Sequence, residues 1–512
     1  MSDGAIEHFD WIANHALRRP DAPAALDLAT GRRFTYGAFH ARIDGIAAGL
    51  AAEFGIGAGD RVASLSLAST DVFELQFACF RLGAIFVPLN IRLADAEFSA
   101  ILGNCAPALL VYDADHAARA VLLQANGGVA RLLASGPDSP FERLATSGAA
   151  PSAYARSSLT DICTLLYTSG TTGLPKGVMV SHAMNLFNAL HCANLAGIDA
   201  QSVHLCVLPL FHTAGLNVFS NPAFHAGGSV VVMAAFDPGA TLRVLGDKAM
   251  GITHFFGVPA HYQFPAAHPD FTRTDFSGIR HAGVGGAPAA ASLIEAWQRQ
   301  GVNLTQGFGM TETGPLMLYL DAVDAARKAG SAGKPAMHAG FRLVGPEGGD
   351  VGDGEVGEIW LRGPSITRGY WNNPEATAAA FSDGWLRTGD AAMRDAQGYY
   401  FIVDRWKDMY ISGGENVYPA EVENVLYRHP AIAEAAVIGV ASPRWGEVGR
   451  AIVVLKPGAV LDEAEVIAHC AANLARYKLP QGVVFTDILP RNATGKVHKP
   501  TLRAAHGTAA AV

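Results

Sequence analysis

Basic side chains are not in excess in this 512-residue sequence, and no segment concentrates them. Lys and Arg together number 38 against 46 for Asp and Glu, which gives a formal net charge of -8 at pH 7. Because nucleic-acid phosphates require a basic footprint, this balance argues against a nucleic-acid partner. No stretch of about 18 apolar residues is free of charged or turn residues, and no secretory leader pattern opens the chain. We expect a cytoplasmic protein without a transmembrane segment and leave peripheral membrane contact open.

Cysteine is also scarce, with six residues and no Cys-x-x-Cys pair. In a long intracellular chain we interpret them as reduced, buried residues rather than zinc ligands or catalytic thiols. Apolar residues make up 50% of the sequence, so a large core can form, and the length allows two to four domains. A globular enzyme is therefore the default expectation. The cysteines are Cys79, Cys105, Cys163, Cys192, Cys206 and Cys470.

Apolar runs and helical stretches alternate from Arg61 onward, a pattern typical of βαβ units around a parallel sheet. After Gly340, closely spaced Gly-Pro, Asp-Gly and Gly-Gly pairs predict a β-rich subdomain. Strands are predicted at 62–67, 84–89, 109–112, 162–167, 229–233, 252–256, 279–284, 302–306, 436–440, 451–455 and 483–485. Helices are predicted at 71–82, 95–102, 290–300, from Pro419 and near 464–477.

The predicted fold class is α/β, with a large N-terminal domain of parallel and mixed βαβ sheets and a β-rich subdomain. We place this domain at residues 1–404. A polar hinge is predicted at 405–408, followed by a small mobile α+β domain at 409–512.

Residues 167–177 read YTSGTTGLPKG and directly follow a predicted buried strand. Sheet ends of this kind are where α/β proteins bind ligands. The segment combines hydroxyl donors, glycines that let backbone amides approach a ligand, and the cation Lys176, so we predict a polyphosphate-binding loop. It is not a Walker A loop, because Pro175 and Gly177 flank the lysine where that motif requires Gly and then Ser or Thr. A flexible surface linker is the alternative.

Further motifs follow in order, and the set resembles the adenylate-forming superfamily of acyl-CoA synthetases, luciferases and nonribosomal adenylation domains. The resemblance covers about residues 35–499. The motifs are GGAP at 285–288, GFGMTET at 307–313, the segment 357–371, WLRTGD at 385–390, the segment 404–418 and LPRNATGK at 489–496.

The resemblance implies that the protein joins a carboxylic acid to ATP, giving acyl-AMP and pyrophosphate, and then transfers the acyl group to coenzyme A (CoA), releasing AMP. Such a site must neutralise phosphate charge, so Mg²⁺ is expected. Glu312 is suited to hold Mg²⁺ through one carboxylate while the metal keeps waters and phosphate oxygens, and the superfamily places the metal there. The alternative is an N-cap box that uses Thr311.

The small domain contributes separate residues by the same resemblance. Lys496 enters the active site to bridge the substrate carboxylate and the α-phosphate, and Lys407 is the hinge about which the domain rotates after pyrophosphate leaves. Rotation brings Ser412, Gly413 and Gly414 to line a tunnel for the pantetheine thiol, where glycines suit a close approach. As isolated residues these would be read as surface side chains or a plain turn.

His212 lies in an apolar segment, where a lone histidine is more often a core residue. The matching position in acyl-CoA ligases is aromatic and lies between the acyl pocket and the thiol tunnel, so we assign His212 to gating. The implied catalytic residues are Lys496, Glu312, Thr311, Thr168 and His212. The implied ATP site consists of Thr168, Ser169, Gly170, Thr171, Thr172, Gly173, Lys176, Gly285, Gly286, Ala287, Gly307, Phe308, Gly309, Met310, Thr311, Asp390, Ile402, Arg405 and Lys496. The implied acyl pocket consists of His212, Thr213, Val258, Tyr262, Gly283, Gly285, Phe308, Gly309 and Leu316.

The candidate pocket segments are 212–217, 256–264, 283–287 and 308–318. They contain no Lys or Arg and one acid, Glu312. A substrate with a second carboxylate or an ammonium would be buried there without a partner, so we expect a neutral monocarboxylic acid. Among acyl-CoA ligases the chain resembles bacterial fatty-acyl-CoA synthetases most, and hydroxycinnamate ligases share nearly all of the same motifs. The resemblance therefore implies a medium- or long-chain fatty acid first and a hydroxycinnamate such as 4-coumarate or ferulate second. A luciferase-like oxygenase and a non-catalytic nucleotide-binding module are more remote. CoA is the expected acceptor, because the chain ends soon after Lys496 without a carrier domain. The sequence leaves a homodimer open.

Overall fold

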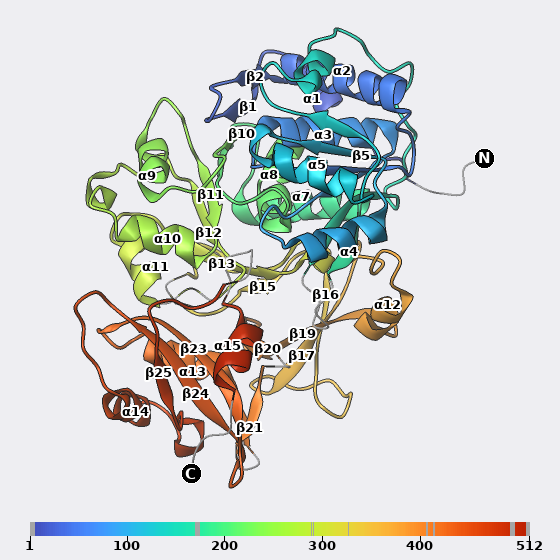
Figure 1. Cartoon of the computed structure of the whole chain (residues 1–512). Coiled ribbons are helices and arrows are strands. Elements are labelled where there is room, and N and C mark those ends of the chain that lie inside the picture. The colour runs from blue at the N-terminus through green and yellow to red at the C-terminus, as the bar shows by residue number, and fades with distance from the viewer. Residues whose placement is uncertain are drawn as a thin grey trace.

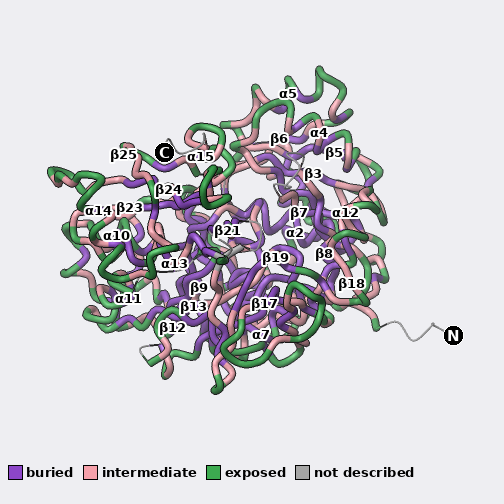
Figure 2. The backbone as a smooth tube through the Cα atoms, turned by 90° about the horizontal axis from the view of Figure 1, so that it is seen from below, coloured by how far each residue is buried: buried purple, intermediate pink, exposed green. Residues whose placement is uncertain are grey.

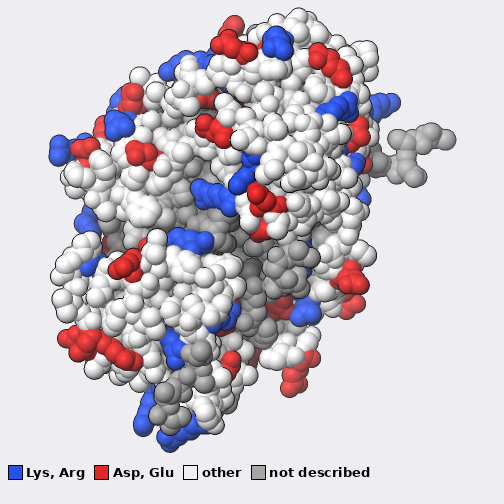
Figure 3. All heavy atoms as spheres, viewed as in Figure 1, with Lys and Arg blue, Asp and Glu red and all other residues white. Residues whose placement is uncertain are grey.

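The computed structural model describes residues 6–168, 175–287, 289, 291–325, 327–405, 408–412, 415–491 and 497–507. The strands within these residues form four sheets, and the predicted α/β class is confirmed (Figure 1). No helix in the described part is long and apolar enough to cross a bilayer. On the face seen in Figure 3, acidic and basic side chains are interspersed rather than gathered into one basic field.

The first large sheet has the strand order β6-β5-β3-β4-β7-β8. Its neighbours run parallel except β7 and β8, which form an antiparallel pair. The continuous apolar runs of the sequence suit strands that are covered on both faces. The strands are β3 (Arg61–Leu65), β4 (Ile85–Pro88), β5 (Leu109–Tyr112), β6 (Leu132–Ala134), β7 (Ile162–Thr168) and β8 (Lys176–Ser181).

The second large sheet has the order β15-β14-β13-β12-β11-β9-β10-β1-β2. The predicted strand 302–306 is wrong at both ends, since β13 starts at Leu304 and continues to Gly309. Residues 307–309 remain in the strand because they pair antiparallel with β14. The strands are β1 (Pro23–Asp27), β2 (Arg33–Thr35), β9 (Val203–Cys206), β10 (Ser229–Val232), β11 (His254–Gly257), β12 (His281–Val284), β13 (Leu304–Gly309), β14 (Leu316–Tyr319) and β15 (Lys334–Pro335).

Helices pack around these two sheets. Helix α3 (Thr70–Leu82) is buried along its whole length and contacts β4 of the first sheet and β1 of the second, so it lies between them. The others are α1 (Trp11–Arg18), α2 (Tyr36–Phe54), α4 (Asp95–Cys105), α5 (Ala117–Ala125), α6 (Pro140–Ala145), α7 (His182–Ala196), α8 (Ser220–Ala226), α9 (Pro238–Gly246), α10 (Pro259–Ala266) and α11 (Ala291–Gln298).

The predicted β-rich subdomain is an antiparallel sheet of β16 (Gly340–Val344), β17 (Val356–Arg362), β18 (Phe381–Ser382), β19 (Trp385–Arg394) and β20 (Tyr400–Arg405), with α12 (Pro374–Ala380) beside it. The C-terminal part contains a fourth sheet of β21 (Tyr410–Ser412), β22 (Glu415–Val417), β23 (Ile432–Ser442), β24 (Gly446–Leu455) and β25 (Val483–Phe485). Its helices are α13 (Pro419–Leu426), α14 (Glu463–Ala471) and α15 (Lys499–His506). The helix predicted near 464–477 is therefore too long: α14 ends at Ala471, and a 3₁₀ turn follows at Arg476–Lys478.

Buried residues follow the strands of the sheets, and exposed residues gather on the outer helices and loops (Figure 2). The C-terminal part has its own core, with buried residues between Tyr410 and Leu502 that pack mainly on one another. This packing agrees with a separate small domain, while the hinge itself stays a prediction. All six cysteines are buried and free, as interpreted from their spacing.

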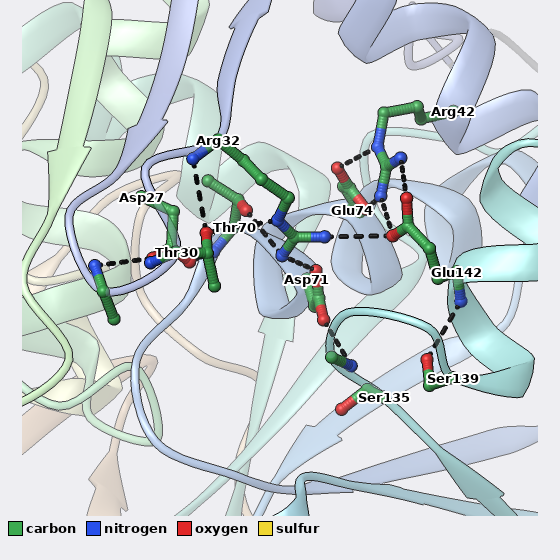
Figure 4. A network of polar contacts seen from close by, with 12 residues as sticks. Asp27, Thr30, Arg32, Arg42, Thr70, Asp71, Glu74, Ser135, Ser139 and Glu142 are labelled. Carbon is green, nitrogen blue, oxygen red and sulfur yellow. Dashed lines mark hydrogen bonds and ion pairs between the residues drawn. The ribbon is translucent and has the colours of Figure 1, made fainter.

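A network of charged side chains joins α2, α3, α6 and the loop between β1 and β2 (Figure 4). Arg42 makes paired hydrogen bonds to Glu74, at 2.7 and 3.0 Å, and further bonds to Glu142 at 2.7 and 2.8 Å. Arg32 pairs with Asp71 and, at 3.0 Å, with Glu142. Glu74 is fully buried, and burial raises its pKa to about 7. Three carboxylates thus share two guanidinium groups away from the predicted catalytic residues.

Candidate active site

The predicted phosphate loop connects two strands that are paired to their ends. Thr168 closes β7, Lys176 opens β8, and the two residues form the last pair of the antiparallel ladder. The Thr168 hydroxyl donates to the Lys176 carbonyl at 3.5 Å. A Cβ at Gly177 would lie 3.0 Å from the Tyr167 ring, so this position favours glycine. Both ends of the loop are therefore fixed at one sheet edge, while Ser169, Gly170, Thr171, Thr172 and Gly173 lie outside the described residues.

Tyr370 connects the phosphate loop to the predicted metal ligand. The ammonium nitrogen of Lys176 lies 5.3 Å from the centre of the Tyr370 ring, within the range of a cation–π contact. The Tyr370 hydroxyl donates to Oε1 of Glu312 at 2.9 Å. Three sequence-distant motifs thus meet at one tyrosine. Sequence reasoning quoted Tyr370 within a motif but gave it no role, and only its position after an Arg-Gly pair could have drawn attention to it.

Backbone hydrogen bonds hold Tyr370 in this place. Residues 369–371 run beside β8 through an isolated antiparallel bridge between Val178 and Tyr370. The Trp371 amide donates to the Gly177 carbonyl at 2.7 Å, and the Thr367 amide donates to the Glu312 carbonyl at 2.8 Å. The backbone on either side of Tyr370 therefore fixes the position of this residue, in addition to the contacts of its side chain.

Glu312 lies in a 3₁₀ turn, Thr311–Thr313, and is 6% exposed. The Met310 amide donates to the Thr313 hydroxyl at 3.0 Å, so Thr313, not Thr311, closes this turn. The N-cap residue of this turn is Met310, so the N-cap alternative for Thr311 is wrong. Thr311 itself is buried at 8% exposure.

The residues around Glu312 fit a Mg²⁺ ion that takes only part of its ligands from the protein. Within the described ranges, no group of three or more His, Cys, Asp or Glu side chains is placed to hold a metal ion. A metal at Glu312 would need phosphate oxygens and waters as its remaining ligands, which is the way Mg²⁺ is usually bound.

Three residues of the implied ATP site, Asp390, Ile402 and Arg405, lie on two paired strands of the β-rich subdomain. Asp390 of β19 is opposite Arg405 of β20, and Ile402 is opposite Ala392 in the same ladder. Asp390 is 7% exposed. The preceding Gly389 lies inside β19, where the pairing with β17 is irregular; it has a φ of 72°, and its amide donates to Glu358 at 3.0 Å. The register brings Asp390 and Arg405 together, although the Arg405 side chain lies outside the described part.

The two glycine-rich nucleotide motifs follow neighbouring strands. Strands β12 and β13 are parallel partners, so residues 285–287 and 307–310 lie at the same sheet edge. A Cβ at Gly285 would lie 3.0 Å from the Phe256 ring and 3.2 Å from the Gly307 carbonyl. Gly286 has a φ of 79°, which other residues rarely adopt. Close packing thus accounts for the glycines at 285 and 307, and the positive φ accounts for Gly286. Phe308, Gly309 and Met310 follow Gly307 at the same end of the sheet.

The predicted acyl-pocket residues divide into a wall and a support. His212 and Thr213 precede a π-helical turn, Ala214–Val218, and Val258 precedes α10. Tyr262, by contrast, is 0% exposed, and its hydroxyl donates to the carbonyls of Phe255 at 3.2 Å and Gly283 at 2.8 Å. Tyr262 therefore acts as a core residue that supports Gly283. Phe256 opens the candidate pocket segment 256–264 but was not among the predicted pocket residues, and it packs against both Gly283 and Gly285.

Family models match most of the chain. Residues 12–371 match the AMP-binding enzyme family, and residues 421–496 match the AMP-binding enzyme C-terminal domain. The chain belongs to the AMP-binding enzyme family. It is 41% identical over 497 residues to feruloyl-CoA synthases of Amycolatopsis sp and Streptomyces sp, with 97% of this chain and 98% of each relative covered.

Two further comparisons agree with this assignment. The AMP-binding enzyme is 37% identical over 506 residues to a long-chain-fatty-acid–CoA ligase of Mycobacterium tuberculosis, covering 97% of this chain and 98% of the relative. The crystal structure of ATP-bound MatB from Rhodopseudomonas palustris matches it with a TM-score of 0.90 at 33% identity, covering 97% and 99% of the two chains. The protein is an ATP-dependent acyl-CoA ligase, an AMP-forming acid–thiol ligase that uses a small-molecule acid, ATP, Mg²⁺ and CoA.

The C-terminal part of the AMP-binding enzyme contains the predicted tunnel residues and the predicted catalytic lysine, and described residues lie on either side of them. Ser412 ends β21 and is 5% exposed. Arg491 and Val497 form a β-bridge on either side of the segment that contains the predicted lysine. Arg503 of α15 donates to the buried carboxylate of Asp408 at 2.7 Å, which ties the helix after that segment to the predicted hinge. Lys407, Gly413, Gly414 and Lys496 themselves lie outside the described residues.

Proposed function

We propose that this acyl-CoA ligase activates a neutral monocarboxylic acid whose carboxylate is attached to a compact aromatic group, of the hydroxycinnamate class. The observation that carries the proposal is the aromatic layer beside the predicted acyl pocket. A Cβ at Gly283 would meet the Phe256 ring at 2.9 Å and the Phe219 ring at 3.3 Å. Phe219 in turn contacts Phe256 edge-on at 5.4 Å between ring centres.

This layer limits the depth of the pocket on that side. Behind Phe219 lie the buried rings of His254 and His281, at 6.0 and 5.7 Å. A long alkyl chain requires a deep tunnel, whereas a planar ring fits against a flat wall of glycine backbone and aromatic side chains. The similarity to feruloyl-CoA synthases supports the same choice, which places the hydroxycinnamate ahead of the fatty acid that came first in the sequence analysis.

The tail of the acid should be uncharged. The pocket segments 212–217, 256–264, 283–287 and 308–318 contain no Lys, Arg or Asp, and their one Glu is Glu312. A second carboxylate in this setting would lose its hydration without gaining a partner, at a cost of about several kcal/mol.

A medium- or long-chain fatty acid is the second candidate. The similarity to a long-chain-fatty-acid–CoA ligase and the apolar side chains of Val258 and Leu316 favour it. Apolar burial would then strengthen binding by about 0.8 kcal/mol per methylene until the pocket is full.

The residues have the following proposed roles. Thr168, Lys176 and the loop between them hold the phosphates, and Glu312 would hold Mg²⁺, which when bound neutralises phosphate charge. Asp390 accepts hydrogen bonds from the ribose hydroxyls. Lys496 stabilises the developing charge at the α-phosphate during adenylation, and His212 separates the acyl pocket from the thiol tunnel.

An acid screen tests the proposal. The purified enzyme is given ATP, Mg²⁺ and one of ferulate, 4-coumarate, octanoate, palmitate or succinate, and AMP release is measured with and without CoA. We expect kcat/KM to be highest for ferulate or 4-coumarate and AMP release to depend on CoA. Palmitate at the head of the series would establish the second candidate, and succinate at its head would contradict the neutral pocket.

A further inference from the structure

The π-helical turn Ala214–Val218 is an irregular element directly after the predicted gate residue His212. The Leu216 amide donates to the His212 carbonyl at 3.0 Å, so the turn starts from the gate itself. A Cβ at Gly215 would lie 2.4 Å from the Pro209 carbonyl, so the turn is packed tightly against the chain before it. π-Helical turns occur often at functional sites, and their extra residue must be held by specific contacts.

A row of buried amide side chains provides these contacts. Asn217 Oδ1, within the turn, accepts from Nδ2 of Asn221 at 2.7 Å. Asn221 Oδ1 accepts from Nε2 of Gln76 on α3 at 2.9 Å. Asn217 Nδ2 donates to the Thr213 hydroxyl at 3.4 Å. The turn is thus connected to the helix between the two large sheets.

Asn188 of α7 connects the same turn to the opposite side of the pocket. Its Nδ2 donates to the Asn217 carbonyl at 2.5 Å, and its Oδ1 accepts from the Leu316 amide at 3.0 Å. One turn further along α7, His191 forms a hydrogen bond through Nδ1 to the Leu316 carbonyl at 3.1 Å. Leu316 is therefore held at both backbone polar groups by a single helix, and Asn188 joins it directly to the turn that follows His212.

These amides lie deep in the protein. Gln76 is 0% exposed, and Asn188, Asn217 and Asn221 are each 1% exposed. Burying an amide is unfavourable unless its polar atoms are paired, and an apolar side chain would fill the same space without that requirement. Polar networks that are fully satisfied fix one geometry of the groups they join. None of these residues belongs to the predicted ATP or catalytic set.

We propose that Asn188 is a positioning residue for the acid substrate, because it sets the separation between the turn after His212 and Leu316, the two walls of the acyl pocket. The inference rests on the proposed location of that pocket but not on which acid fills it. Loss of the Asn188 bridge lets Leu316 and the turn move apart or together, which changes the fit of the acyl group and leaves the phosphate loop untouched.

The test compares Asn188→Leu and Asn188→Ser with the matched control Asn185→Leu. Asn185 lies on the same helix and is 3% exposed, but its amide donates to the Cys163 sulfur at 3.4 Å instead of joining the pocket walls. For each variant, KM for the acid, KM for ATP and the thermal midpoint are measured. The ratio of kcat/KM between ferulate and octanoate is measured as well.

We expect both Asn188 variants to raise KM for the preferred acid by about tenfold, because this corresponds to the loss of about one buried hydrogen bond. Both variants should also change the ratio of kcat/KM between ferulate and octanoate. KM for ATP should stay within twofold of wild type, on the order of measurement error. Asn185→Leu should shift the thermal midpoint but neither the acid KM nor the ratio.

Three results would overturn the inference. The first is an unchanged acid ratio in both Asn188 variants. The second is a parallel rise of KM for ATP and for the acid, and the third is a failure of both variants to fold, because each of these two would make Asn188 a general packing residue. A wild-type preference for octanoate would contradict the proposed acid instead, and a changed ratio in the variants would still support Asn188 as the positioning residue.

Discussion

The hydroxyl of Tyr370 donates a hydrogen bond to Glu312 at 2.9 Å while the face of its ring lies 5.3 Å from the Lys176 ammonium group. One side chain therefore orients the predicted metal ligand and contacts the predicted phosphate cation. A carboxylate with one oxygen held in this way presents a defined direction for a metal ion or for phosphate-bound water. We infer that Tyr370 couples metal binding to the phosphate loop.

Tyr370→Phe should lower kcat/KM for MgATP by about tenfold, because it removes a hydrogen bond to a charged group but keeps the ring beside Lys176. Raising the Mg²⁺ concentration should restore part of the loss. The measurement is acid-dependent ATP–pyrophosphate exchange across a Mg²⁺ series. The control is Tyr399→Phe, which removes an equivalent tyrosine–carboxylate bond, to Asp324, at a distant site. Equal losses in the two variants would rule out a special role for Tyr370.

Lys496→Ala should abolish acyl-adenylate formation and leave thioester formation from supplied acyl-adenylate largely intact. Loss of one preorganised charge at the transition state costs about 3 to 4 kcal/mol. The two half-reactions are measured separately, with Lys456→Ala, which removes an exposed lysine of the same C-terminal part, as the control. If both half-reactions fall equally, Lys496 does not have the proposed role.

Lys407→Pro should have the converse effect. Proline fixes φ and cannot absorb the dihedral change that a hinge requires, so ATP–pyrophosphate exchange should persist while acyl-CoA formation fails. A bulky residue at Gly413 should give the same split by blocking the thiol tunnel. Both variants are assayed for exchange and for acyl-CoA by mass spectrometry. A joint loss of the two activities would argue against rotation between two conformations.

The charged network of Figure 4 predicts a pH-dependent stability. Burial raises the pKa of Glu74 from 4.5 to about 7, so the folded protein holds a proton that the unfolded chain releases. The free energy of unfolding should therefore decline as pH rises from about 4.5 to 7 and should not change further through this group above that range. Glu74→Gln should flatten this decline, as measured by urea denaturation at several pH values. An unchanged slope would show that Arg42 keeps Glu74 ionised throughout.

Periodicity in the sequence was sufficient to predict β3, β4, β5 and β7 of the first large sheet and β10, β11, β12 and β13 of the second, but not the other strands of these sheets. Strands β3, β4, β5 and β7 form where apolar runs of four to seven residues follow helical stretches, because parallel strands covered on both faces need such runs. The end of β13 was missed because residues 307–309 belong to the strand only through pairing with β14, which is formed later in the chain. The residues of a segment do not by themselves indicate which other strand will pair with it.

The candidate site shows the same limit. Glu312 and Asp390 were predicted because each lies in a motif of the family, GFGMTET at 307–313 and WLRTGD at 385–390. The role of Tyr370 depends on its bridge to Val178 of β8. The role of Asn188 depends on its hydrogen bonds to the Asn217 carbonyl and the Leu316 amide, which belong to other elements. No pattern in the sequence distinguishes Asn188 from an ordinary core side chain, and the motif that contains Tyr370 gave no indication of its role. Tyr262, predicted to line the pocket, proved to be a support because its hydroxyl is used by two backbone carbonyls.

A direct competition between two acids tests the central claim most directly. Equal concentrations of ferulate and dodecanoate are mixed with ATP, Mg²⁺, CoA and a small amount of enzyme, and the two acyl-CoA products are quantified early in the reaction. Their ratio equals the ratio of the two kcat/KM values and is independent of enzyme concentration. We predict an excess of feruloyl-CoA by about tenfold or more, because the aromatic layer beside Gly283 favours a planar ring over a long chain. An excess of dodecanoyl-CoA would contradict the proposed substrate class.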